Sequence, residues 1–440
     1  MNKLIELDPE TSLVLKDQLQ TEGKHKFLRT LFVTPSQLKS INLFWIGIIL
    51  YVIGHTLAVT LLVNAAPFQL IQLVGIGLFI YAFSQIAQFR FDNAYLQVMF
   101  VLLVLWTVGI VTRGLDLSYY RIKVMLFEPY EGALFYLIPF ALFLPKNLLF
   151  YKKTFDTIII LGVFFFLHDL LVVGSILQRG TEEGKNFVEV LTKTLAVPAG
   201  FILLTYKYHP FRRTLLSAAV LGSAALLATF HARRSLMLLC LNPFIFSYLF
   251  YLINSKRQFF VIFYSLFIAC FLALFAEAIV NDDKDGLLSY VLERGTSDTR
   301  TGVEECLYND MEPIDWIIGK GINGSYYCPN IELDGVTDYR SGIESDYLNI
   351  ILKGGIVHLA LIILIALPAV FMGIFQSNNL LAKAAGVWVL FYLLYLYPSP
   401  VTKFNLNYLL VWVCIGICYS KAIRHMSENM LVLYFRKEIN

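Results

Sequence analysis

About twelve apolar runs, most of them long enough to cross a lipid bilayer, constrain this chain more than any other feature. Inside hydrocarbon, backbone N–H and C=O groups have no water to bond, so only helices and closed barrels span. The alternating pattern of a membrane β-barrel is absent. We therefore predict an all-α, polytopic integral membrane bundle of about 12 transmembrane helices. The runs lie at 42–63, 67–87, 95–112, 131–144, 155–174, 191–206, 214–230, 235–253, 258–280, 347–374, 380–397 and 404–420.

Polar segments between and beside these runs define the organisation of the chain. With 58% hydrophobic and 15% charged residues, the chain does not fit a soluble globular class. One polar segment is much longer than the other connections. The predicted division is a cytoplasmic N-terminal segment at 1–41, transmembrane helices 1–9 at 42–280, one large extracytoplasmic loop at 281–346, transmembrane helices 10–12 at 347–420, and a cytoplasmic tail at 421–440.

The distribution of charge orients the bundle. The N-terminus, the tail and alternate connections hold more than half of the 35 Lys and Arg residues, and such an excess marks the cytoplasmic side. The long loop is acidic instead, with 15 Asp and Glu residues against 5 Lys and Arg residues. We predict a multi-pass protein of a bacterial inner membrane, with both termini in the cytoplasm and the loop in the periplasm. Neither ATP nor nucleotide sugars are available there.

Two of the six cysteines, Cys306 and Cys328, lie in the long loop. An oxidising periplasm permits a disulfide, and closing a loop of this length contributes roughly 3 kcal/mol in the chain-entropy description. The sequence does not show whether their Cβ atoms approach each other. Paired and free thiols therefore both stay open.

Two adjacent arginines, Arg233 and Arg234, lie at the outer junction of two apolar runs and depart from the orientation rule. An Arg near hydrocarbon is costly and is normally retained where it meets an anion or a water-filled cavity. Guanidinium groups bind phosphate through paired hydrogen bonds, so the predicted partner is a lipid-linked diphosphate. Snorkelling of both side chains to outer headgroups is the alternative.

Other ionisable residues interrupt apolar segments. His168 and Asp169 lie inside a predicted helix, where such residues are functional candidates by default, although a buried structural pair explains them at least as well. Lys353 lies about two turns inside the run that starts near Tyr347 and is predicted to face a cavity. Arg121 lies in an outer connection rich in tyrosine, which also fits an interfacial aromatic belt. These five residues are the candidates for contact with substrate.

No metal or nucleotide motif accounts for the acidic loop. Asp283-Lys284-Asp285 matches the Asp-x-Asp pattern with which nucleotide-sugar transferases hold a metal, but such matches are common in acidic loops. The chain has no metal-ligand cluster, Walker motif or nucleophile elbow. We therefore predict no metal, no other cofactor and no nucleic-acid partner.

Two motifs carry a resemblance to a known family: Trp316-Ile317-Ile318-Gly319-Lys320-Gly321 and Glu344-Ser345-Asp346-Tyr347-Leu348-Asn349-Ile350-Ile351-Leu352-Lys353-Gly354-Gly355. Together with the bundle, the outer arginines and the late outer loop, they resemble the superfamily of O-antigen polymerases (Wzy-type, joining polysaccharide repeat units) and O-antigen ligases. The resemblance implies a GT-C-like, metal-independent glycosyltransferase whose donor is an oligosaccharide on undecaprenyl diphosphate. The diphosphate-binding residues that it implies are Arg233 or Arg234 and, in the loop, Arg300 with Arg294 or Arg340.

The resemblance also implies an active-site base. The ligases carry a His before the helix that follows the loop, whereas this chain has Glu344 there. That departure weakens the ligase reading and makes Glu344 the candidate base, with Asp346 as the second candidate. A base within reach of the acceptor hydroxyl assists glycosyl transfer.

The predicted function is therefore polymerisation of undecaprenyl-diphosphate-linked repeat units into O-antigen, capsular or exopolysaccharide at the periplasmic face of the inner membrane. An O-antigen ligase acting on lipid A-core is the alternative. A polysaccharide flippase or transporter is the second alternative, disfavoured because the two halves lack matching interrupted helices. The expected partners are the lipid-linked oligosaccharide and membrane lipid, and whether a chain-length regulator protein binds stays open.

Overall fold

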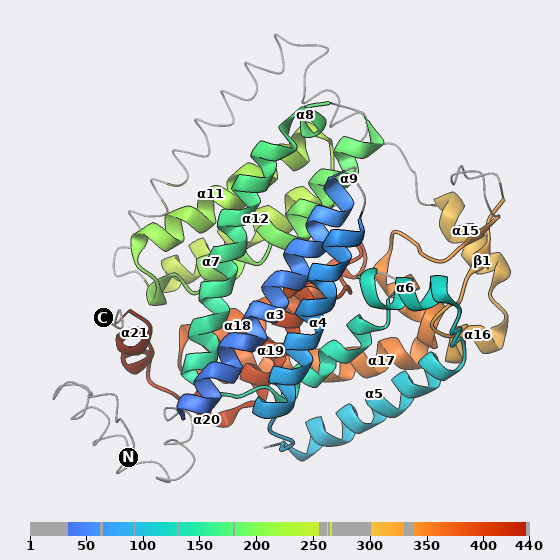
Figure 1. Cartoon of the computed structure of the whole chain (residues 1–440). Helices are drawn as coiled ribbons and strands as arrows, with labels where there is room; N and C mark the ends of the chain where they lie inside the picture. Colours follow the sequence, from blue (N-terminus) through green and yellow to red (C-terminus); the bar gives the residue numbers. More distant parts are fainter. Residues whose placement is uncertain are drawn as a thin grey trace.

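The computed structural model describes residues 34–61, 65–91, 93–129, 132–178, 181–254, 262, 265, 301–329 and 338–436. Within these ranges the chain is almost entirely helical, and its strands form one short two-stranded ribbon (Figure 1). Eight of the described helices are long and apolar enough to cross a membrane. The protein is therefore an all-α polytopic membrane protein, as the apolar runs predict.

The helices follow the predicted apolar runs. The first group comprises α3 (Pro35–Thr60), α4 (Ala66–Ile86), α5 (Ala94–Thr112), α6 (Tyr119–Phe127), η1 (Leu134–Phe143), α7 (Leu148–Leu171), α8 (Val173–Ile176), α9 (Glu182–Leu191), η2 (Thr192–Ala196), α10 (Ala199–Leu204), η3 (Tyr206–Tyr208), α11 (Phe211–Phe230) and α12 (Arg234–Asn254). The second group comprises α15 (Thr301–Asp310), α16 (Pro313–Ile318), α17 (Asp346–Phe375), α18 (Leu380–Tyr395), α19 (Leu406–Tyr419), α20 (Lys421–Arg424) and α21 (Glu428–Arg436). Apart from Ile262 and Ser265, the predicted run 258–280 lies outside the described residues.

Helix α3 begins before its apolar run. Thr34 caps it: the Thr34 side chain accepts from the backbone N–H of Gln37, and the Gln37 side chain accepts from the N–H of Thr34. Pro35 occupies the first helical position, where its missing N–H costs nothing. The N-terminal boundary predicted at residue 41 therefore falls inside a helix.

The element η1 differs from the spanning helices. It is a 3₁₀ helix of 10 residues with Pro139 inside it, and Pro has no N–H for the helical ladder. At about 2.0 Å per residue it extends about 20 Å, which is short of the hydrocarbon thickness of about 30 Å. The predicted run 131–144 is thus an apolar helix that is too short to cross. The helices α18 and α19 are also short, with 16 and 14 residues.

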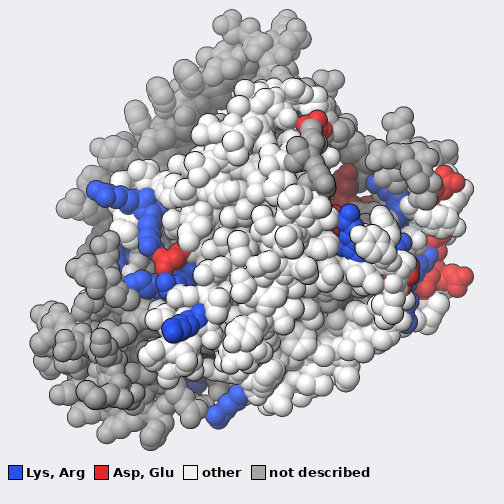
Figure 2. All heavy atoms as spheres, viewed as in Figure 1, with Lys and Arg blue, Asp and Glu red and all other residues white. Residues whose placement is uncertain are grey.

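The two ends of the bundle differ in charge. In Figure 1, α21 lies at one end of the molecule and α15, α16 and β1 (Tyr326–Tyr327) lie at the other. On the face shown in Figure 2, Lys and Arg side chains predominate near the first end, whereas most of the Asp and Glu side chains gather near the second. Which side of a membrane each end faces stays a prediction from the sequence.

Helix α17 is interrupted at Gly355, where φ is 70° and ψ is 177°. This backbone region is open essentially only to glycine. The interruption leaves carbonyl groups without their usual helical partners, and other segments supply donors. The bonds run from Lys320 N to Leu352 O (2.7 Å), from Gly321 N to Lys353 O (2.9 Å), and from Trp106 Nε1 to Gly354 O (2.7 Å). The part of α17 after Gly355 extends about 30 Å, enough to cross the hydrocarbon alone.

The two sequence motifs meet at this interruption. Gly319, with φ of 73°, contacts Lys353, and a Cβ on Gly319 would lie 2.5 Å from Lys353 O. A Cβ on Gly355 would lie 2.0 Å from Ile317 O. Glycine is therefore required on both sides of the contact, which explains why both motifs carry it.

The residues around α15 and α16 form a small folded unit that we call the outer lobe (residues 301–329 and 338–345). Strand β1 pairs antiparallel with β2 (Tyr339–Arg340), with Tyr326 opposite Arg340. The lobe has its own apolar core, and that core continues into the first turns of α17. Its buried members are Val303, Leu307, Met311, Tyr326, Cys328, Ile343, Leu348, Ile351 and Leu352. The lobe is thus anchored to the start of α17.

A disulfide joins Cys306 of α15 to Cys328 beside β1, with 5.1 Å between the two Cα atoms. This resolves the pairing that the sequence leaves open.

We expect non-reducing mass analysis of the purified protein to find Cys306 and Cys328 in one cross-linked peptide pair. Replacing both by Ser should destabilise the lobe by roughly 3 kcal/mol and increase its cleavage by protease. Two free thiols in protein recovered from an oxidising compartment would contradict the pairing.

Candidate functional site

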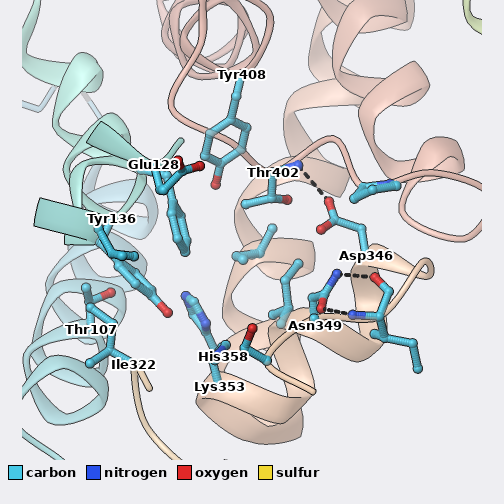
Figure 3. Close-up of a pocket in the computed structure, with 18 of the residues that line it drawn as sticks. Thr107, Glu128, Tyr136, Ile322, Asp346, Asn349, Lys353, His358, Thr402 and Tyr408 are labelled. Atoms are coloured by element: carbon cyan, nitrogen blue, oxygen red, sulfur yellow. Dashed lines mark hydrogen bonds between the residues drawn. The ribbon is translucent and has the colours of Figure 1, made fainter. Parts of the chain in front are cut away.

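A cavity of about 750 Å³ lies between α5, α6, η1, the first turns of α17 and the start of α19 (Figure 3). Its volume is within the range of small-molecule sites. The polar residues that line it are Gln69, Thr107, Tyr120, Lys123, Glu128, Tyr136, Arg340, Ser341, Glu344, Asp346, Asn349, Lys353, His358, Thr402 and Tyr408. The lining contains cations, carboxylates and aromatic rings together, which suits a ligand with both phosphate and sugar parts.

Asn349 fixes the loop that carries Glu344. The Asn349 side chain donates to Ile343 O at 2.6 Å and accepts from Ile343 N at 2.8 Å (Figure 3). From the lobe side, Tyr326 donates its hydroxyl to Gly342 O at 3.1 Å. Burial raises the pKa of Tyr326 to about 12, so the hydroxyl keeps its proton. Held from both sides, Glu344 lines the cavity with an exposed side chain.

Asp346 lines the same cavity, but its side chain is buried and hydrogen-bonded to backbone. Its side chain is 2% exposed, and its Oδ2 accepts from the backbone N–H groups of Val401 (3.0 Å) and Thr402 (2.7 Å). A buried carboxylate with two backbone donors braces the connection between α18 and α19. Of the two predicted candidate bases, Glu344 has the exposed side chain and Asp346 the buried one.

Three cations reach the cavity: Lys123 from α6, Arg340 from β2 and Lys353 from the turn before the α17 interruption. Lys353 Nζ donates to Gly324 O at 2.7 Å, which ties the lobe to the cavity wall. Three acidic side chains, those of Glu128, Glu344 and Asp346, also line the cavity. The cavity therefore offers both basic and acidic side chains to a ligand.

Aromatic rings form one wall of the cavity. The rings of Tyr136 in η1 and His358 in α17 are stacked, with centroids 6.1 Å apart. Figure 3 shows both rings directed at the interior of the cavity. The Nδ1 atom of His358 is buried and has no hydrogen-bond partner among the described residues. Aromatic faces are suitable surfaces for sugar rings, because their apolar bodies are combined with polar tips.

Several residues predicted from the sequence lie away from this cavity. Tyr347 stacks on Tyr397, with centroids 6.1 Å apart, and Arg121 lies over the ring of Tyr120 at 6.0 Å. His168, fully buried, shares a hydrogen bond of 2.8 Å with Thr60. None of Tyr347, Arg121, His168 and Asp169 lines the cavity. Arg294, Arg300 and the motif Asp283-Lys284-Asp285 lie outside the described residues.

The arginines at the α11–α12 junction are also absent from the cavity lining. Arg234 is exposed, and Arg233 Nη1 lies 3.8 Å from Glu189 Oε2. Lys193 donates to the other oxygen of Glu189 at 2.6 Å. Lys403, next to the cavity-lining Thr402, is buried, and burial, followed by the charge of Lys193, holds its pKa well below the usual range. Arg233 thus belongs, with Glu189 and Lys193, to a partly exposed charge cluster.

Four cavity residues with ionisable side chains were not predicted from the sequence: Lys123, Glu128, Tyr136 and His358. A signal existed for two of them. The run 131–144 is shorter than a spanning helix, and short apolar runs are often re-entrant or interfacial. Treating it as such would have drawn attention to Tyr136 within it and Glu128 just before it. Nothing in the sequence distinguishes His358 from other intramembrane histidines.

Among the described residues, no group of three or more His, Cys, Asp or Glu side chains is arranged to hold a metal ion. No family model, curated protein or solved structure matches this chain.

Proposed function

We propose that this protein is a membrane glycosyltransferase that polymerises oligosaccharide repeat units carried on undecaprenyl diphosphate. The observation that carries the proposal is the cavity at the outer lobe, whose lining combines an exposed carboxylate, Glu344, with cations and aromatic rings. Transfer of a sugar from a lipid diphosphate requires a base and groups that bind the diphosphate and the sugar. It requires little else, because diphosphate is already a good leaving group.

The proposed reaction uses Glu344 as the base. The hydroxyl of the acceptor sugar attacks the anomeric carbon of the donor, and the bond from that carbon to the diphosphate oxygen breaks. The bonding electrons leave with the diphosphate, and the hydroxyl proton passes to Glu344. A positioned base of this kind contributes about 10²-fold to 10⁴-fold.

The cations stabilise charge on the departing diphosphate. We assign this role to Lys123, Arg340 and Lys353, because all three line the cavity. Preorganised donors that meet developing charge in a water-poor site are commonly the largest contribution to catalysis. Arg340 offers a planar fork for two phosphate oxygens, which neither lysine can reproduce.

Ligase and transporter functions are the alternatives. A ligase would use the same donor chemistry with a different acceptor. A transporter is expected to have paired interrupted helices at the midplane. Here the segment of α17 after Gly355 is long enough to span alone, so the interruption and the cavity fit the membrane boundary. That position favours chemistry at the outer face over transport.

Deletion of the gene tests the reaction class. If the protein is a polymerase, the deletion strain should display single repeats on its lipid core in place of long polysaccharide. Loss of all attached polysaccharide would instead identify a ligase. Unchanged chain length would reject both, and accumulation of repeat units on the cytoplasmic side would identify a transporter.

The proposed sidedness has its own test, motivated by the charge difference between the two ends. A reporter that is active only after translocation should be active when fused near Asn309 and inactive when fused after Arg424. A reporter that is active only in the cytoplasm should give the opposite pattern. Activity of the translocation reporter at Arg424 alone would invert the topology and exclude a periplasmic site.

A further inference from the structure

A second, apolar cavity of about 270 Å³ lies between α3, α4, η1 and the start of α19. We call it the apolar groove. Its lining is hydrocarbon and aromatic except for Asn405 and the hydroxyl of Tyr51. Ile80 and Leu137, which line it, are 48% and 47% exposed. The groove is therefore reachable from the flank of membrane-spanning helices, where lipid is the solvent.

The groove shares its walls with the cavity described above. In η1, Pro139 lines the cavity, whereas its neighbours Ile138 and Phe140 line the groove. In the connection before α19, Thr402 lines the cavity and Phe404 lines the groove. Two residues of extended backbone cover only about 7 Å. The two spaces thus lie within a few residues of each other, an arrangement that suits one amphiphilic ligand with a polar head in the cavity and an apolar tail in the groove.

The size of the groove limits its occupant. At about 270 Å³ it is little more than a third of the volume of the cavity at the outer lobe, and its lining is almost entirely apolar. A narrow, flexible hydrocarbon chain suits such a space. Aromatic rings make its wall rigid: Phe404 packs edge-on against Tyr51 at 4.7 Å and lies 5.4 Å from Phe79.

A polar group at the groove lacks a partner. Tyr51 is 1% exposed, and its hydroxyl has no hydrogen-bond partner among the described residues. A buried hydroxyl without a partner is unfavourable, so a ligand oxygen is a natural acceptor for it. A lipid phosphate ester would supply this acceptor if the oxygen that joins its first isoprene unit lies where the groove adjoins the cavity, whereas a pure hydrocarbon would not.

We infer that the groove binds the first isoprene units of the polyprenyl diphosphate whose head occupies the cavity. This inference rests on the proposed function, because it takes the lipid diphosphate as the ligand of the cavity. It adds the part of the carrier that the protein recognises and the helices that recognise it, α3, α4 and η1.

Photolabelling of the full-length protein in nanodiscs tests this inference. The probe is a farnesyl diphosphate analogue with a diazirine on its second isoprene unit. Labelled peptides should come from α3, α4 or η1. Excess undecaprenyl diphosphate should prevent labelling, and excess phosphatidylethanolamine should not. Equal competition by the phospholipid would show a general acyl-chain site and overturn the inference.

A matched pair of variants adds specificity. Ile80→Trp fills the mouth of the groove and should lower labelling roughly tenfold, a change of about 1.4 kcal/mol. Ile160→Trp on α7 changes the same residue type at the same 48% exposure, away from the groove lining, and should label normally. Leu137→Trp, on the opposite wall, repeats the first test if Ile80→Trp is poorly inserted. Equal labelling of the groove variants and the control would overturn the inference.

Failure of the inference is distinguishable from failure of the proposed function. Labelling reports where the lipid binds, whereas polymer formation reports the reaction, so the two measurements can fail independently. If labelling stays in the groove while Glu344→Gln polymerises normally, the proposed reaction is wrong and the lipid site stands. If polymer formation depends on Glu344 but labelling lies outside the groove, the reaction stands and the groove assignment is wrong.

Discussion

Glu344→Gln should form polymer about 10²-fold more slowly than the wild type, or worse, with unchanged amounts of protein in the membrane. Gln keeps the shape of the side chain and loses the ability to take a proton from the acceptor hydroxyl. The loop that carries it stays in position, because Asn349 and Tyr326 hold the backbone of Ile343 and Gly342. The measurement is polymer length and rate in a deletion strain that expresses the variant.

Glu305→Gln is the matched control for this prediction. Glu305 lies exposed on α15, in the same acidic lobe but away from the cavity lining. It should polymerise normally. Normal polymer from Glu344→Gln at normal abundance would remove Glu344 as the base, and Glu128, the other glutamate in the cavity, would then be tested in the same way.

Gly355→Ala should destabilise the protein by more than about 4 kcal/mol, in the range of exceptional single substitutions. Its φ of 70° and ψ of 177° lie in a region that costs a side-chain-bearing residue about 1–3 kcal/mol. The new Cβ would also lie 2.0 Å from Ile317 O, a backbone atom that cannot rotate away. We expect a much lower melting temperature in detergent and faster proteolysis of the outer lobe.

Gly222→Ala provides the control for backbone effects. Gly222 lies inside α11, where a Cβ would meet nothing within 4 Å. Ala is favoured over Gly in a helix by about 0.5–1 kcal/mol, so this variant should be as stable as the wild type or slightly more so. If Gly355→Ala melts together with Gly222→Ala, the interruption of α17 is not required for stability.

The spanning helices were predictable because hydrophobic length alone determines them. A run such as 67–87 becomes α4 (Ala66–Ile86) since an apolar chain in lipid has to pair its own backbone groups. Boundaries were less certain where polar residues extend a helix, as Pro35 does for α3. The place of η1 in the cavity wall was not predicted, because composition does not distinguish a short spanning helix from an apolar helix that lines a cavity.

The candidate site was predictable only in part. Glu344 and Lys353 lie in the second of the two motifs and Arg340 lies in the acidic loop, and the cavity brings all three together. For Arg233, the sequence does not reveal that its side chain lies 3.8 Å from Glu189, which is remote in sequence. Ion pairs between segments that are remote in sequence decide whether a charged side chain is available to a ligand. Composition does not reveal such pairs.

The interruption of α17 has a consequence for the order in which the protein is assembled. The donors that complete it, Lys320 and Gly321, precede α17 in the chain and belong to the outer lobe. Synthesis therefore delivers the lobe before the helix that needs it. Until the lobe has folded, the carbonyls of Leu352 and Lys353 lack these partners. The cavity, which is partly lined by residues of the lobe, is thus completed only when the lobe has folded against α17.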